Sequence, residues 1–276
     1  MYAETKLEPG LQIDDLRDDL HDDELYQDPL SPYTTGDTLR SLLLWPVAIA
    51  QMAGWLPVFW LLDRTLLPGR RIDGLARLVC WLGTRSVGIR VRQQGLERID
   101  RDRGYLIALN HVSLLDTPVL VQSVPIYARS FQDAAHFRIP LYGSFVRIMG
   151  QLPVHRDDKE LNRRSYRQAL SMLREGHSFA VFPEGHRTRD GRLGRFYPGA
   201  FRLAIEAGVP VLPVCSRGLR ELCPAREWRM RPGRVDVLFG EPIPTDELTL
   251  ADPDVEQLAV RTRARMNALL HAAPGE

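Results

Sequence analysis

The chain has 276 residues, 44% of them hydrophobic and 26% charged, which is the balance of a folded protein and excludes global disorder. The net charge of +1 conceals a division between an acidic start and a basic remainder. Residues 1–40 carry eleven acidic and three basic residues, whereas residues 41–276 carry 24 acidic and 33 basic residues. The basic remainder favours phosphate-bearing ligands or an anionic bilayer surface, with ordinary solvated arginines as the alternative. The three cysteines have no metal-like spacing and cannot all pair, which indicates a reduced, cytosolic setting.

Residues 1–40 are rich in Asp and end in Pro-, Thr- and Gly-containing sequence, so we expect a mobile tail with one short helix over 14–25. Residues 41–62 contain no charge and, as a helix of about 33 Å, are long enough to cross hydrocarbon. The segment is not a signal peptide, because it follows an acidic tail rather than a basic start. A core helix is the alternative, and Pro46 and Pro57 would kink the helix in either setting.

The sequence around this segment predicts membrane contact. Three tryptophans lie along it, as expected of anchors at a membrane interface: Trp45, Trp55 and Trp60. Basic residues are more frequent after it than before it, so the positive-inside rule predicts that the rest of the chain lies on the cytoplasmic face. The pattern over residues 72–89 predicts an amphipathic partner helix, so we expect residues 41–88 to form a membrane-embedded helical pair. Hydropathy does not decide whether residues 41–62 span the bilayer or only embed in it.

Short apolar runs alternate with helical patterns from residue 89 onward. Seven strands are predicted, over residues 89–91, 106–109, 126–130, 151–154, 178–182, 211–214 and 235–239. Helices are predicted over residues 116–122, 141–149, 160–175, 199–207 and 252–270. This alternation is typical of the α/β class, so we expect residues 89–276 to form one domain with a mixed, largely parallel sheet flanked by helices.

A histidine and an aspartate lie five residues apart where the strand over 106–109 ends, in the sequence Asn110-His-Val-Ser-Leu-Leu-Asp116. An imidazole can take a proton from an alcohol near neutral pH, and a carboxylate fixes its tautomer and stabilises the imidazolium. Five residues on a helix leave two side chains about 140° apart, so the pair needs a turn. We expect His111 at the strand end and Asp116 as the N-cap of the next helix. A structural hydrogen-bonded pair is the alternative.

Another polar segment, Phe182-Pro-Glu-Gly-His-Arg187, follows the strand over 178–182. The exit of a strand is where α/β folds place ligand-binding groups. Gly185 lets the backbone approach a ligand closely, and Arg187 offers a planar fork that matches phosphate oxygens. A tight turn with a solvated arginine is the alternative. No Gly-x-Ser-x-Gly elbow surrounds any serine, so covalent serine catalysis is disfavoured.

With two further blocks, these segments resemble the glycerolipid acyltransferases of the 1-acylglycerol-3-phosphate type. The blocks of that family are NHxxxxD, a G…R block, FPEGxR and a VPxxPV block. Here the second runs from residue 140 to Arg156 and the fourth is Val209-Pro-Val-Leu-Pro-Val214. The resemblance covers roughly residues 89–240, and it implies transfer of an acyl group from a thioester directly to a hydroxyl.

The resemblance also implies a role for each matched residue. His111 would be the general base, and Asp116 would hold its ring. Glu184, Gly185 and Arg187 would position the glycerol phosphate of a lysophospholipid, and Arg156 would bind its phosphate, with a structural salt bridge as the competing role for Arg156. The acyl donor would be acyl-CoA or acyl-carrier protein, no cofactor would be bound permanently, and a membrane-dipping helical pair would precede the catalytic domain.

Three departures from the family pattern bear on the acceptor. His186 replaces a small hydroxyl residue, residues 134–138 offer only His136 and Arg138 as basic residues, and no lysine precedes Gly199. The open alternatives are therefore another lysolipid, such as a lyso-amino-acid lipid, and a catalytically silent membrane-binding homologue. The histidines show no paired-ligand spacing with cysteine, and the basic residues lack a reading motif, so metal and nucleic acid are disfavoured as partners.

Overall fold

The computed structural model describes residues 32–65, 70–155, 158–188 and 190–272. The predicted short helix over 14–25 lies outside these residues. The two N-terminal helices are α1 (Thr35–Thr65) and α2 (Arg70–Ser86). A capping box starts α1, because the N–H of Thr34 donates to the Asp37 carboxylate at 2.9 Å and the N–H of Asp37 donates to Thr34 Oγ1 at 3.1 Å. The helix therefore begins six residues before the uncharged segment and contains both prolines.

Seven strands form one sheet in the order β1-β7-β6-β2-β5-β3-β4. All neighbouring strands are parallel except β6 and β7, which pair antiparallel, so the prediction of a mixed, largely parallel sheet is confirmed. The strands are β1 (Ile89–Gln94), β2 (Leu106–Leu109), β3 (Ala128–Asp133), β4 (Leu152–Val154), β5 (Ser178–Val181), β6 (Val211–Arg217) and β7 (Gly233–Phe239). Each predicted strand has its counterpart, although β3 begins two residues later than expected and β6 continues three residues further.

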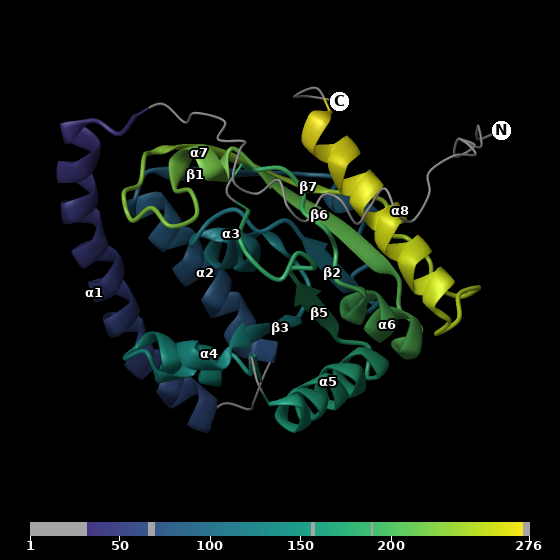
Figure 1. Ribbon diagram of the computed structural model, residues 1–276. Coiled ribbons are helices and arrows are strands. Elements are labelled where there is room, and N and C mark those ends of the chain that lie inside the picture. Colours follow the sequence, from purple (N-terminus) through teal and green to yellow (C-terminus); the bar gives the residue numbers. More distant parts are fainter. Residues whose placement is uncertain (1–31, 66–69, 156–157, 189, 273–276) are drawn as a thin grey trace. The chain divides into compact units, whose positions relative to one another are not determined.

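Helices cover both faces of this sheet (Figure 1). One face carries α5 (Lys159–Arg174), α6 (Pro198–Ala207) and α8 (Asp252–His271), and α3 (Asp116–Ser123) packs on the other. Successive residues of β2 divide between the two cores, with Leu106 and Ala108 in the first and Ile107 and Leu109 in the second. Shorter elements complete the fold: α4 (Tyr142–Ile148), α7 (Leu219–Leu222) and the 3-10 helices η3 (Leu96–Arg98) and η4 (Ala134–Arg138).

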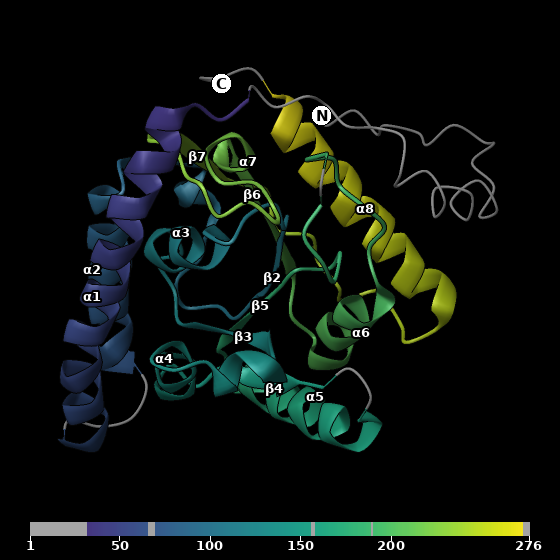
Figure 2. The same cartoon turned by 60° about the vertical axis from the view of Figure 1, so that its left-hand side comes forward.

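The N-terminal helices lie side by side against the α/β domain, with α4 near the C-terminal half of α1 (Figure 2). A small apolar cluster of Phe59, Ile72, Ala76 and Met149 joins α1, α2 and the end of α4. A buried ion pair also fastens α2 to the sheet, because Arg129 of β3 lies 2.9 Å from the carboxylate of Asp73. The described part of α2 is therefore packed into the domain rather than separate from it.

Candidate active site

The site lies where β2 and β5 end side by side. These strands are parallel neighbours, so their carboxyl ends meet at one edge of the sheet and bring Asn110 and Phe182 to the same place. Asn110 fastens the end of β2 to β6 on its other side. Its amide Nδ2 donates to the carbonyl of Ser216 at 3.0 Å, and the Ser216 N–H donates back to Oδ1 at 2.8 Å.

The loop after Asn110 wraps around the Asp116 carboxylate. Oδ2 of Asp116 lies 2.7 Å from Nδ1 of His111 and accepts the backbone N–H groups of Val112 and Ser113, both at 2.8 Å. Asp116 is 4% exposed, whereas the His111 side chain is 23% exposed. The second carboxylate oxygen of Asp116, Oδ1, has no hydrogen-bond partner among the described residues. The loop thus fixes the carboxylate and leaves the imidazole accessible.

The expectation that Asp116 caps the following helix is wrong. The N-cap position of α3 belongs to Leu115, and Asp116 is the first helical residue. Its side chain turns back toward the loop, where its Oδ2 contacts three groups at once. The Ser113 hydroxyl is buried and accepts the N–H of Leu115 at 3.1 Å, so Ser113 helps to close the turn.

The segment after β5 contacts this loop closely. The Phe182 ring stacks on the His111 imidazole, with centroids 4.0 Å apart and planes inclined by 20°. Glu184 is buried and uses both carboxylate oxygens on backbone donors, the N–H of His111 at 3.0 Å and the N–H of Gly194 at 2.9 Å. The pKa of Glu184 is raised to about 7, mainly by burial and in smaller part by the nearby Asp116, while the two N–H donors act in the opposite direction.

The other predicted acceptor residues differ in how they are placed. Gly185 has φ +71°, and a Cβ atom there would lie 2.9 Å from the Tyr197 ring, so both the backbone and the available space require glycine. His186 is exposed and Arg187 is half-buried. Within the described ranges, Arg187 has no hydrogen-bonded or ion-paired partner. Arg156 lies outside the described residues.

A small cavity lies beside Asp116. It is lined mostly by apolar side chains from the strand ends and α3: Leu109, Asn110, Asp116, Val119, Leu120, Phe182, Val214, Ser216 and Val237. Val214 comes from the block that resembles VPxxPV, so this buried strand also contributes to the wall of a cavity. Among the described residues there is no cluster of three His, Cys, Asp or Glu side chains that could hold a metal ion. The three cysteines are free thiols.

Comparison with known proteins agrees with this geometry. Residues 90–217, which contain all four sequence blocks, match the Acyltransferase family model. The chloroplastic 1-acyl-sn-glycerol-3-phosphate acyltransferase BAT2 of Brassica napus is 34% identical over 152 residues, or 54% of this chain and 44% of that protein. Over these residues the chain is therefore similar to acyltransferases of the 1-acyl-sn-glycerol-3-phosphate type.

Other acyltransferases match this chain over a larger share of their own length. The 1-acyl-sn-glycerol-3-phosphate acyltransferase of Pseudomonas aeruginosa is 26% identical over 61% of this chain and 65% of its own. The human alpha enzyme of the same name is 29% identical, over 65% of this chain and 63% of its own. A crystal structure of the acyltransferase PlsC from Thermotoga maritima shares the fold, with a TM-score of 0.69, 24% identity and coverage of 84% of this chain and 97% of that one. The chain spans less than half the length of the first curated plant relatives it matches.

Proposed function

We propose that this chain is an O-acyltransferase that moves a fatty acyl group from acyl-CoA or acyl-carrier protein to the free hydroxyl of 1-acylglycerol-3-phosphate, forming phosphatidate. The observation that carries the proposal is the His111–Asp116 pair, 2.7 Å apart at the edge of the sheet, inside a region that matches the Acyltransferase family. The names of the curated relatives support this acceptor.

His111 is the general base in this proposal. Its Nδ1 faces Asp116, and this contact assigns the proton of the neutral ring to Nδ1 and leaves Nε2 as the acceptor. Nε2 takes the proton of the acceptor hydroxyl as its oxygen attacks the thioester carbonyl. The tetrahedral intermediate then expels the thiolate, which receives that proton from the imidazolium. Asp116 stabilises the imidazolium between the two steps.

Arginine side chains bind the acceptor phosphate in this proposal. Arg187 follows the glycine turn, is half-buried, and carries a guanidinium group that can make two parallel hydrogen bonds to a phosphate. Gly185 allows the turn to approach the glycerol portion, and Arg156 supplies a second cation.

The helical pair anchors the domain to a membrane surface. Among the described residues, one segment, Thr35–Leu62, is long and apolar enough to cross a bilayer, with a mean hydropathy of 1.6, and 6% of its most apolar window is buried. Its exposed large apolar residues are Leu39, Leu42, Leu43, Val47, Ile49, Val58, Trp60 and Leu61. A core helix would bury these side chains, so the structure favours contact with lipid over the core-helix alternative.

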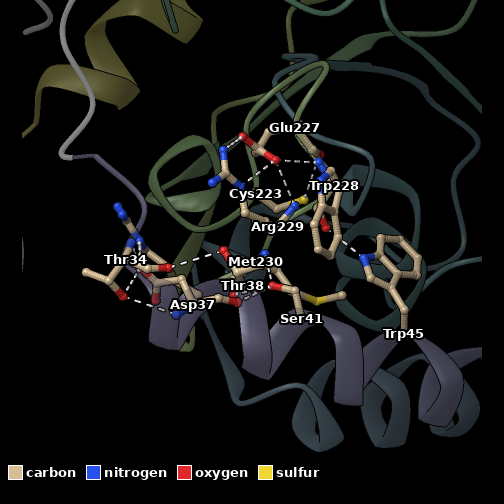
Figure 3. Close-up of polar contacts among 11 residues, drawn as sticks. Thr34, Asp37, Thr38, Ser41, Trp45, Cys223, Glu227, Trp228, Arg229 and Met230 are labelled. Atoms are coloured by element: carbon tan, nitrogen blue, oxygen red, sulfur yellow. Dashed lines mark hydrogen bonds and ion pairs between the residues drawn. The ribbon is translucent and has the colours of Figure 1, made fainter.

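The contacts of α1 favour embedding over spanning. Near its start, Ser41 exchanges hydrogen bonds with the backbone of Met230, and the Trp45 indole donates to the Trp228 carbonyl at 2.6 Å (Figure 3). Near its end, Phe59 packs edge-on against Phe145 of α4. These contacts are about 27 Å apart along the helix at 1.5 Å per residue, and both are made with the same domain. We propose that α1 lies in the cytoplasmic leaflet, with residues 89–276 as the catalytic domain and with the acidic tail predicted over residues 1–40 ending where α1 begins, at Thr35.

The experiment that tests the proposal incubates the purified protein in detergent with acyl-CoA or acyl-carrier protein donors and a panel of lysolipids. Formation of phosphatidate from 1-acylglycerol-3-phosphate is the expected result. A preferred lyso-amino-acid lipid would keep acyl transfer but replace the acceptor, which is the alternative that His186 leaves open. Absence of any diacyl product with every donor and acceptor would refute acyl transfer.

A further inference from the structure

The residues after β5 hold His111 from three sides. The Glu184 carboxylate accepts the His111 N–H at 3.0 Å, and the N–H of Thr188 donates to the His111 carbonyl at 2.8 Å. Between these backbone contacts, the Phe182 ring covers one face of the imidazole at a centroid distance of 4.0 Å. A segment seventy residues away in sequence therefore contacts the backbone and the ring of His111.

Glu184 also connects this loop to a third segment. Its second oxygen accepts the N–H of Gly194, and the carbonyl of Gly194 accepts a hydrogen bond from Arg263 of α8 at 3.0 Å. Glu184 is 1% exposed, and each of its oxygens accepts a backbone N–H. A ligand hydroxyl could therefore reach this buried carboxylate only if the surrounding loop moved, and a movement that broke either backbone contact would leave a buried N–H without an acceptor, which is costly.

We propose that Glu184 and Phe182 are positioning residues for His111, and that Glu184 does not bind the acceptor directly. This inference rests on the proposed function of His111 as the base. The hydrogen bond from the His111 N–H fixes the main chain at the end of β2, and the stacked ring limits rotation of the imidazole out of the plane in which Nδ1 meets Asp116. Small errors in the placement of a reacting group cost large factors in rate, so this support acts on the chemical step rather than on binding.

The test is a comparison of kcat and KM in six variants, three at the site and three for comparison, with acceptor and donor varied separately. Glu184→Gln keeps the shape of the side chain but turns an amide NH2 toward one backbone N–H, and Phe182→Leu removes the stacked ring. We expect kcat to fall about tenfold to a hundredfold in each, with the acceptor KM changing less than about threefold. Phe182→Tyr keeps a ring face and is expected to restore most of the rate.

Matched controls separate positioning from general destabilisation. Glu206→Gln removes a carboxylate from its contact with Tyr166, between α5 and α6, and Phe131→Leu removes a ring contact with Phe179 at 4.6 Å. Neither residue touches His111, so kcat is expected to stay within about twofold of wild type in the folded fraction. Arg187→Ala provides the opposite pattern, a raised acceptor KM. The same pattern in Glu184→Gln would overturn the positioning role, as would unchanged kcat in both site variants for which a fall is expected.

A spectroscopic readout keeps this inference separate from the proposed function. In protein labelled with ¹⁵N-histidine, the Nδ1–H proton of His111 is assigned by its loss in His111→Ala. We expect this signal to shift or broaden in Glu184→Gln and Phe182→Leu and to remain unchanged in the two controls. If wild type transfers no acyl group, the proposed function fails while this measurement still decides whether the ring is held. An unperturbed signal in both site variants would refute positioning even in an active enzyme.

Discussion

Strand β2 and helix α1 are both strongly apolar, but the protein buries one and exposes the other. Every residue of β2 is buried, because the strand lies between β5 and β6 and has a core on each face. Along α1, Leu43 is 72% exposed and Leu61 is 55% exposed, although the helix packs on α2 and α4. Hydrophobic composition thus predicts that a segment avoids water, whereas the neighbouring elements determine whether protein or lipid replaces the water.

Matched truncations of apolar side chains give the largest expected difference between the two regions. Ile107→Ala in β2 leaves a cavity in a fully buried position and is expected to lower the free energy of unfolding by about 2–5 kcal/mol. Leu43→Ala removes a mostly exposed side chain and should change it by less than about 0.5 kcal/mol in detergent. Chemical denaturation followed by circular dichroism measures both values. Equal losses would show that α1 is packed as tightly as β2.

The pH dependence of stability tests the burial of Glu184, which lies just after β5. The pKa of Glu184 is raised to about 7 in the folded protein, mainly by burial, and lies near 4.5 in the unfolded chain. The folded state therefore binds the proton more tightly, so this residue stabilises the fold fully below about pH 4.5 and loses that contribution as pH rises through about 7. We expect the free energy of unfolding of wild type, relative to Glu184→Gln, to fall by about 3 kcal/mol across this window. A flat or rising difference would contradict the burial effect.

Charged substitutions on the exposed face of α1 test whether this face contacts lipid. Burying one leucine in lipid is worth about 1.5–3 kcal/mol, so Leu43→Glu or Leu61→Glu should reduce binding to vesicles at least tenfold. Val119→Ala, a cavity-wall change away from α1, should leave vesicle binding unchanged and is the control. Flotation on a density gradient with anionic vesicles measures the bound fraction. Retention of binding in a double variant, Leu43→Glu with Leu61→Glu, would show that another surface holds the protein to lipid.

Local patterns predicted the elements and the central pair. Apolar runs of four residues marked β2 and β5, and the five-residue spacing of His111 and Asp116 required the turn that the structure contains. Asp116 was predicted to be an N-cap because such residues commonly accept N–H groups at helix starts, but the donors that it accepts lie in the preceding loop. The aspartate at position 116 thus predicted correctly that a carboxylate accepts backbone N–H groups near the start of α3. Which N–H groups it accepts depended on the loop that contains His111.

The contacts that join distant segments were not predictable from the sequence. Asn110 pairs with Ser216 across 106 positions, and Arg263 reaches the loop that Glu184 holds. The antiparallel pairing of β6 with β7 was equally hidden, because a short apolar strand reads the same in both directions. For Glu184, the family resemblance implied contact with the acceptor, whereas the structure reveals two backbone donors that no local pattern indicates.

The central claim is that His111, oriented by Asp116, removes the proton of a lysolipid hydroxyl. The most direct measurement is the rate of phosphatidate formation by wild type, His111→Ala and Asp116→Asn, with a labelled acyl donor and 1-acylglycerol-3-phosphate, in proteins whose circular dichroism melts agree. The account predicts product from wild type, loss of turnover in His111→Ala, and a rate lower by a factor of about 10² or more in Asp116→Asn. Rates near wild type in both variants would contradict it.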